Sequence, residues 1–127
     1  MVARSVIEPE DMLPAVAQGA IGIELRDDDA PTRARLAALD HAPTALALTA
    51  ERAFLARLEG SCRTPIGGLA EPAGLGRLRL RGQILTPDGR EAHETTVEGP
   101  DADAARLGVA AAEALLARVG PGFFTAT

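Results

Sequence analysis

Cys62 is the one cysteine of this sequence and its clearest candidate for covalent chemistry. It follows Gly60 and Ser61 and precedes Arg63, a composition typical of a loop rather than of a helix or strand. The neighbouring arginine favours the nucleophilic thiolate, whereas the carboxyl end of a preceding helix opposes negative charge. Position alone leaves three interpretations open: an incidental free thiol, a nucleophile and a redox thiol.

The two histidines, His41 and His93, do not indicate a metal centre. Their spacing relative to Cys62 matches no zinc motif, so each is interpreted as a surface or capping residue. A cysteine–histidine nucleophile pair stays open, because such pairs form in space rather than along the sequence. The aspartates at 27–29 lack the spaced ligands and closing glutamate of a calcium loop, and helix capping explains them. We expect no metal site.

Arg77, Arg79 and Arg81 alternate with other residues and therefore share one face of a predicted strand. We interpret this stripe as the solvated face of a sheet, partly paired with glutamates of the returning strand, namely Glu91, Glu94 or Glu98. A face that contacts anions is the alternative. A net charge of −5 and an aromatic content of 2% argue against nucleic acid as a partner.

The remaining composition restricts location and chemistry. A single cysteine fits a reducing, cytoplasmic compartment. No segment resembles a secretory signal, and none approaches the roughly 20 apolar residues that span a bilayer, so no membrane contact is expected. All 13 basic residues are arginine, which excludes lysine Schiff-base chemistry within this chain.

Residues 42–127 are predicted to form an α+β domain with a three-stranded antiparallel sheet and flanking helices. Helical spacing of apolar residues predicts the helices, and alternation predicts the strands. Pro87-Asp88-Gly89 is typical of the turn between two strands. The predicted elements are a helix over 44–58 that Gly60 stops, strands over 66–71, 77–85 and 90–97, and a last helix capped by Asp101 or Asp103 that ends at Gly120.

Residues 1–41 are predicted to be an arm rather than a domain. Residues 20–26 alternate, with Ile21, Ile23 and Leu25 on one face, which predicts a strand. The aspartates then cap a short helix that reaches Leu39, before a break at 40–43. A strand needs a neighbour for its backbone hydrogen bonds. We therefore expect that part of the protein is missing, or that the arm pairs with another chain, for example in a homodimer.

Three stretches together resemble one known family, the hydroxymethylbilane synthases, also called porphobilinogen deaminases. Residues 51–67, ERAFLARLEGSCRTPIG, resemble the signature around the family's cofactor-bearing cysteine. Residues 12–24, MLPAVAQGAIGIE, resemble its interdomain segment, and residues 41–52 also fit. The resemblance covers nearly the whole chain in the order that the family has, and two long motifs at the family's separation are highly specific.

The resemblance implies a transferase of porphyrin (tetrapyrrole, heme) biosynthesis that joins four porphobilinogen molecules into linear hydroxymethylbilane. The growing chain hangs from a dipyrromethane cofactor, which a thioether would hold to Cys62. Gln18 and Gly19 match a segment that lines the family's cleft and are expected to contact the cofactor. No catalytic residue is assigned to this chain, because the family keeps its catalytic aspartate and its carboxylate-binding arginines in its first two domains.

The resemblance also divides the chain. Residues 1–41 would hold the tail of domain two, a hinge and the returning strand and helix of domain one, and residues 42–127 would be the cofactor-attachment domain. Ala17 replaces a glycine of the family's hinge; if that position needs a positive φ, alanine costs about 1 kcal/mol. We expect the chain alone to be an inactive fragment that needs its N-terminal domains. The alternative is a non-enzymatic module for binding or self-association.

Overall fold

The middle strand of the sheet, β2 (Arg77–Leu85), follows from strict alternation of its side chains. Leu78, Leu80 and Ile84 are buried, whereas the arginines between them lie on the opposite face. β1 (Ile66–Pro72) and β3 (Ala92–Pro100) flank it in the antiparallel order β1-β2-β3. The structure, a computed structural model, describes residues 2, 4–61 and 63–125. It confirms the predicted α+β class and the three-stranded antiparallel sheet.

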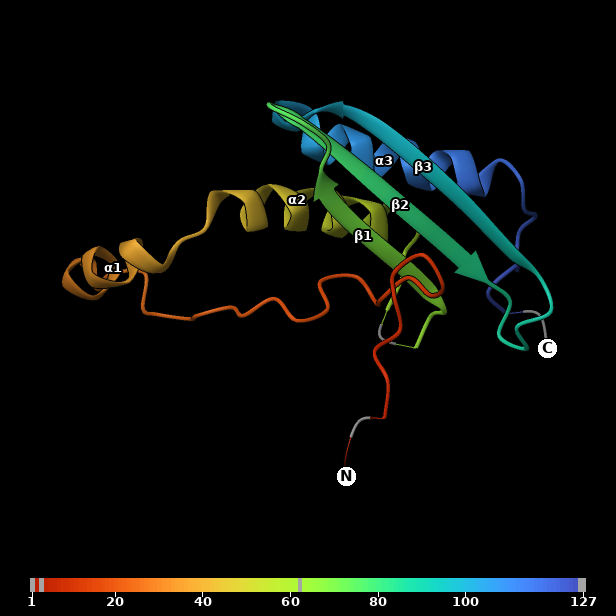
Figure 1. The fold of residues 1–127 in the computed structure, drawn as a ribbon, viewed down its shortest axis with the longest axis horizontal. Helices are drawn as coiled ribbons and strands as arrows, with labels where there is room; N and C mark the ends of the chain where they lie inside the picture. Colours follow the sequence, from red (N-terminus) through yellow and green to blue (C-terminus); the bar gives the residue numbers. More distant parts are fainter. Residues whose placement is uncertain (1, 3, 62, 126–127) are drawn as a thin grey trace.

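Two helices, α2 (Ala42–Arg57) and α3 (Ala104–Leu116), pack side by side on one face of this sheet (Figure 1). Ala50 and Phe54 of α2 and Leu115 of α3 are 0% exposed and form the centre of the core. The sheet makes room for the Phe54 ring at Gly82, where a Cβ would lie 2.6 Å from Phe54 Cζ. The absence of that Cβ lets α2 approach the sheet closely.

Both ends of α2 differ in detail from the prediction. The helix begins at Ala42, with His41 as its N-cap and Pro43 in its first turn. The proline therefore belongs to the start of α2 and not to the predicted break between two helices at 40–43. At the other end, Glu59 has a φ of 54° and takes the left-handed position that the sequence predicts for Gly60. The backbone N–H of Gly60 donates to the Leu55 carbonyl at 3.0 Å. This bond reaches one residue further back than a helical hydrogen bond does, as in a Schellman cap.

The strand predicted over residues 20–26 does not form. Figure 1 shows an extended segment with no neighbouring strand, followed by α1 (Ala30–Leu36) and the 3₁₀ helix η1 (Ala37–Leu39). The physical reason is the lack of a neighbour, because no strand among the described residues lies beside this segment to complete a ladder of hydrogen bonds. The predicted helix is confirmed, with Asp29 as its N-cap.

The last part of the domain follows the prediction with shifted bounds. β3 continues to Pro100 and leads through the 3₁₀ helix η2 (Asp101–Asp103) into α3. Asp103 occupies the N-cap position of α3, but its side chain makes no capping hydrogen bond. α3 ends at Leu116, short of Gly120. The turn at Gly89, with a φ of 71°, is confirmed between β2 and β3.

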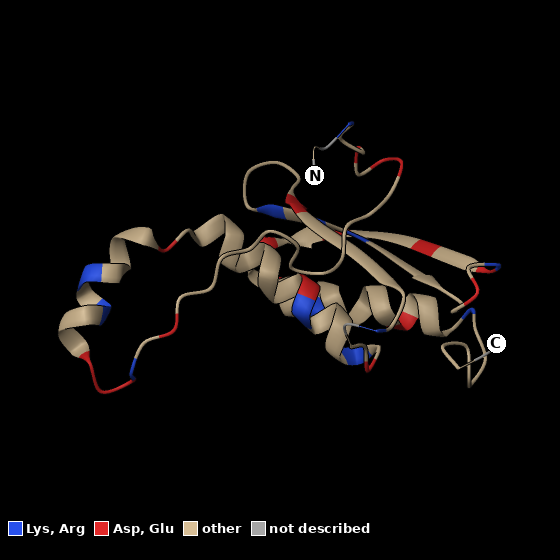
Figure 2. Cartoon of the chain, turned by 90° about the horizontal axis from the view of Figure 1, so that it is seen from below, with Lys and Arg blue, Asp and Glu red and all other residues tan. Residues whose placement is uncertain are grey.

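Charged residues of both signs are interspersed along the helices, the strands and the arm (Figure 2). None of the helices in the described part of the chain has the length and apolar character that crossing a membrane requires.

Candidate functional site

The loop that follows α2 is closed by its own hydroxyl groups. The Ser61 backbone N–H donates to Thr64 Oγ1 at 3.0 Å, and the Thr64 N–H donates back to the Ser61 carbonyl at 3.0 Å. The Arg63 N–H donates to Ser61 Oγ at 3.3 Å. Cys62, the predicted attachment residue, lies outside the residues that the structure describes. Its neighbours on both sides are therefore fixed by a hydrogen-bonded turn whose Arg63 side chain is exposed.

A cavity of about 370 Å³ lies beside this loop. One wall comes from the N-terminal segment 15–19, which includes Gln18 and Gly19, and the other comes from Ser61, Thr64 and the end of α2. The described residues of the lining are Ala15, Val16, Ala17, Gln18, Gly19, Leu55, Ser61, Thr64 and Ile66. Ser61 and Thr64 thus share one cavity with residues more than forty positions away in the sequence, and none of the described side chains that line it is charged.

The segment 14–19 reaches this position by docking on the free edge of β1. The Gly68 N–H donates to the Pro14 carbonyl at 2.9 Å. Val16 packs against the hydrophobic core. The segment then turns, since the Gln18 N–H donates to the Ala15 carbonyl at 3.1 Å. These contacts hold the segment on the domain that carries the loop.

Ala17 and Glu51 complete this docking, and the glutamate was not among the site residues predicted from the sequence. Glu51 is only 5% exposed, and its carboxylate accepts hydrogen bonds from the Ala17 N–H at 2.7 Å and the Ala70 N–H at 2.8 Å. Ala17 has a φ of 61°, so the position that carries glycine in the resembling family does need the left-handed conformation. A glutamate one turn before Phe54, on the apolar side of a helix, was the signal available in the sequence.

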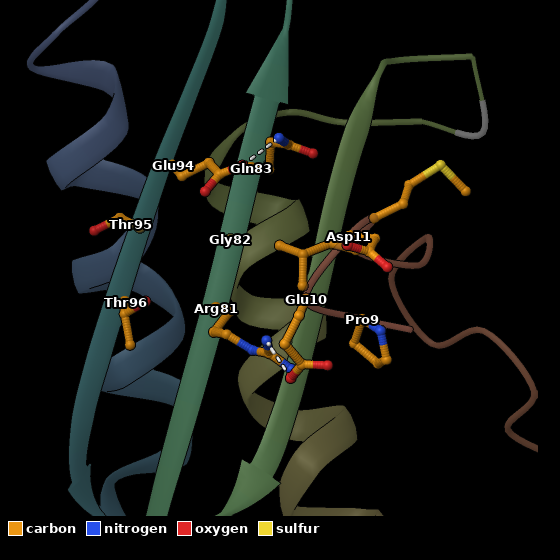
Figure 3. Close-up of a pocket in the computed structure, with 11 residues that line it drawn as sticks. Pro9, Glu10, Asp11, Arg81, Gly82, Gln83, Glu94, Thr95 and Thr96 are labelled. Atoms are coloured by element: carbon orange, nitrogen blue, oxygen red, sulfur yellow. Dashed lines mark hydrogen bonds and ion pairs between the residues drawn. The ribbon is translucent and has the colours of Figure 1, made fainter. Parts of the chain in front are cut away.

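Two of the three arginines of the stripe on the open face of the sheet, Arg79 and Arg81, pair with glutamates. Arg81 pairs with Glu10 of the arm at 3.1 Å (Figure 3). It also pairs with Glu71 at 3.0 Å. Arg79 lies 3.8 Å from Glu71 and 3.9 Å from Glu98, which confirms one of the predicted partners. Two other predicted partners bind elsewhere.

The two remaining glutamates predicted to pair with the arginines have other partners. Glu94 accepts from Gln83 at 2.6 Å, and Glu91 contacts His93 at 2.7 Å. A cavity of about 90 Å³ remains between the arm and the sheet, and Glu10, Asp11 and Glu94 line it together with Arg81 (Figure 3). Three carboxylates beside one paired arginine disfavour an anionic ligand. The interpretation as a paired, solvated face is therefore the better one.

The histidines and the aspartate run have structural roles. His41 caps α2 through Thr44, and the His93 ring lies 5.8 Å from that of Phe123. Asp29 accepts from both the hydroxyl and the backbone N–H of Thr32, which lowers the pKa of its carboxyl. The described residues include no group of three or more potential metal ligands.

Comparison with known proteins assigns the chain to a family. The model of the porphobilinogen deaminase C-terminal domain matches residues 45–117, which is more than half of the chain. The chain belongs to the porphobilinogen deaminase family. The porphobilinogen deaminase model for the dipyrromethane cofactor-binding domain also matches residues 1–34.

Three curated relatives align with this chain over the same length. The porphobilinogen deaminase of Paracoccus denitrificans is 58% identical to this chain over 123 residues. The enzymes of Nitrobacter winogradskyi and Nitrobacter hamburgensis are 52% and 51% identical to it over the same length. Each alignment covers 97% of this chain but 39% of the relative. The chain therefore spans about two fifths of a porphobilinogen deaminase, and its two matched regions belong to two different domains of that family.

Proposed function

We propose that this chain supplies the cofactor-attachment domain of a porphobilinogen deaminase, with Cys62 as the residue that holds dipyrromethane through a thioether. The observation that carries the proposal is the cavity shared by the Ser61–Thr64 loop and the segment with Gln18 and Gly19. Its volume of about 370 Å³ falls within the range of small-molecule sites, about 300–1,000 Å³. The matched family is the one whose cysteine bears this cofactor.

The residues of the cavity fit the cofactor's rings. Val16, Leu55 and Ile66 offer apolar walls for flat pyrrole rings, and the hydroxyls of Ser61 and Thr64 offer acceptors for ring N–H groups. Among the residues that the structure describes, no cationic side chain lines the cavity, so carboxylate substituents would extend outward to arginines of other domains. Gln18 and Gly19 are proposed as cofactor contacts on this basis.

The chemistry required of this chain is that of an anchored nucleophile. Porphobilinogen that loses ammonia becomes an electrophilic azafulvene, and a thiolate at Cys62 is nucleophilic enough to add to its exocyclic carbon and form the carbon–sulfur bond. The resulting thioether resists hydrolysis. The exposed guanidinium of Arg63 favours the thiolate next to it. When held there, dipyrromethane would supply the attachment point for the growing pyrrole chain. The Ser61–Thr64 turn, whose residues flank the attachment residue in the sequence, lines the cavity.

We extend the proposal to the whole protein, which would convert porphobilinogen into hydroxymethylbilane with catalytic groups on the family's first two domains. Residues 1–41 would complete those domains, and residues 42–127 would form the attachment domain. The arm supports this division, because Ile21 is 91% and Ile23 52% exposed, as expected for residues that another part of the protein covers.

The test is intact-mass analysis after incubation with porphobilinogen. The chain alone should neither consume porphobilinogen nor gain mass. With the N-terminal part of a relative added, it should gain the mass of two pyrrole units, and Cys62→Ser should gain none. An equal adduct on Cys62→Ser would refute the assignment of Cys62, and sustained turnover by the chain alone would refute the division of labour between the domains.

A second candidate function is self-association through the arm. Ile21, Ile23 and Leu25 lie with Leu36 and Leu39 around an exposed apolar hollow of about 210 Å³. A second copy could cover this surface instead of the remaining domains. Light scattering distinguishes the two, because a monomer at high concentration contradicts self-association, whereas a dimer that Ile23→Asp dissociates supports it.

A further inference from the structure

The free edge of β1 is occupied by groups that do not belong to a strand. β1 pairs with β2 on one side only, so backbone N–H groups on its other side need acceptors. The Gly68 N–H donates to the Pro14 carbonyl at 2.9 Å. Two residues further along, the Ala70 N–H donates to Glu51 Oε1 at 2.8 Å. A helix side chain thus continues the hydrogen bonding that the segment 14–19 begins.

The same carboxylate also holds the segment. Glu51 Oε2 accepts from the Ala17 N–H at 2.7 Å, so one side chain of α2 bridges the strand edge and the docked segment. Glu51 is 5% exposed, and hydrogen bonds to a charged acceptor shielded from water are among the stronger ones in proteins. Ala17 stays in its left-handed conformation, with a φ of 61°, at the point where this bond is made.

We propose that Glu51 is a positioning residue that fixes one wall of the cavity beside the Cys62 loop. The wall formed by residues 15–19 is joined to the domain by the Ala17 bond and by the Pro14–Gly68 bond. The opposite wall, at Leu55, Ser61 and Thr64, continues directly from the helix that carries Glu51. Glu51 therefore sets the separation of the two walls, and its role in cofactor placement rests on the function proposed above.

The chemistry of the bridge separates positioning from simple packing. Glutamine has nearly the shape of glutamate, so a packing role predicts little change in Glu51→Gln. A bridging role predicts a selective loss, because the amide has one acceptor oxygen and its NH₂ group would face the second N–H donor. The bond to the regular strand at Ala70 should survive, and the bond to Ala17 should be lost.

Amide hydrogen exchange by NMR on this 127-residue chain tests the inference. In Glu51→Gln, the Ala17 amide should exchange faster by roughly tenfold or more, the ratio expected for losing a hydrogen bond to a charged group. Amides in β2 and β3 should keep their wild-type rates. The matched control is Glu113→Gln, which removes the same charge from an exposed ion pair with Arg57 at 3.4 Å and should leave Ala17 unchanged.

Unchanged protection of Ala17 in folded Glu51→Gln would overturn the inference. If that variant does not fold, the wild-type chain decides, since Ala17 must be protected while the exposed amides of residues 21–25 exchange freely. Equal, unprotected exchange across both groups would also overturn it. The exchange result can be distinguished from a failure of the proposed function. A chain that shows this exchange pattern but never accepts cofactor on Cys62 would support the Glu51 bridge and contradict the proposed function.

Discussion

Gly108 of α3 lies directly against the backbone carbonyl of Ala50 in α2. A Cβ at Gly108 would collide with that oxygen and would lie 2.8 Å from both Ala53 Cβ and the Phe54 nitrogen. The two helices therefore meet backbone to backbone at this point. This approach sets the position of α2, and α2 in turn carries both Glu51 and the loop that contains Cys62.

Gly108→Ala should destabilise the domain. Alanine normally favours a helix over glycine by about 1 kcal/mol, but overpacking at a rigid contact costs about 1–3 kcal/mol. The free energy of unfolding in urea should therefore fall by up to about 2 kcal/mol, towards the upper end because the collision is with backbone. Gly120→Ala, where a new Cβ has nothing within 4 Å, is the control and should change stability by less than about 0.5 kcal/mol. Equal midpoints for the two variants would show that the helices can separate without cost.

Ala17→Gly should stabilise the chain. Its φ of 61° is strained for alanine and ordinary for glycine, although glycine also loses more entropy on folding. The net expectation is a rise of up to about 1 kcal/mol in the free energy of unfolding. Ala20→Gly, at a position without a positive φ, should be neutral or destabilising. A lower urea midpoint for Ala17→Gly than for Ala20→Gly would contradict the strain.

Thr64→Val should loosen the loop around Cys62. Valine keeps the shape of threonine but removes the acceptor for the Ser61 N–H at 3.0 Å. Losing one such hydrogen bond is worth about 1 kcal/mol, so the Ser61 amide should exchange roughly fivefold faster. Thr64→Ser keeps the hydroxyl and should preserve the slow exchange. Identical rates in the valine and serine variants would mean that the hydroxyl does not hold the turn.

The start of α1 should weaken in acid. The Thr32 hydroxyl, followed by the Thr32 backbone N–H, lowers the pKa of Asp29 below its usual 3.8. A lowered folded-state pKa means that the cap contributes fully above the unfolded value and is lost as pH falls through the folded one. The Thr32 amide resonance should therefore shift below about pH 4. Thr32→Val should move this transition to higher pH, and an unmoved transition would assign it to another group.

The strands and the two domain helices could be predicted because each follows from local pattern. Alternation along 77–85 and the Pro87-Asp88-Gly89 turn determine the hairpin irrespective of the rest of the chain. The structure brings Gln18 and Gly19 beside Ser61 and Thr64, and the contact of these two residues with the cofactor, which the resemblance implies, stays a prediction.

The features that could not be predicted depend on partners distant in sequence. A strand over 20–26 needs a neighbour that the described residues do not supply, so its pattern alone was insufficient. Glu51 is buried because two backbone N–H groups from different segments converge on it, which no local pattern encodes. The shift of the left-handed residue from Gly60 to Glu59 reflects the exact length of α2, and helix ends are poorly defined by sequence.

The docked segment 14–19 also covers part of the edge of β1 and so hinders the addition of strands from other molecules. An open strand edge is a template on which further strands can add, the first step towards fibrils. Here Pro14 and Glu51 already occupy two N–H groups of the β1 edge, and on the other side Arg118 Nη1 donates to the Glu94 carbonyl of β3 at 2.7 Å. Any displacement of residues 14–19 therefore uncovers a surface prone to aggregation.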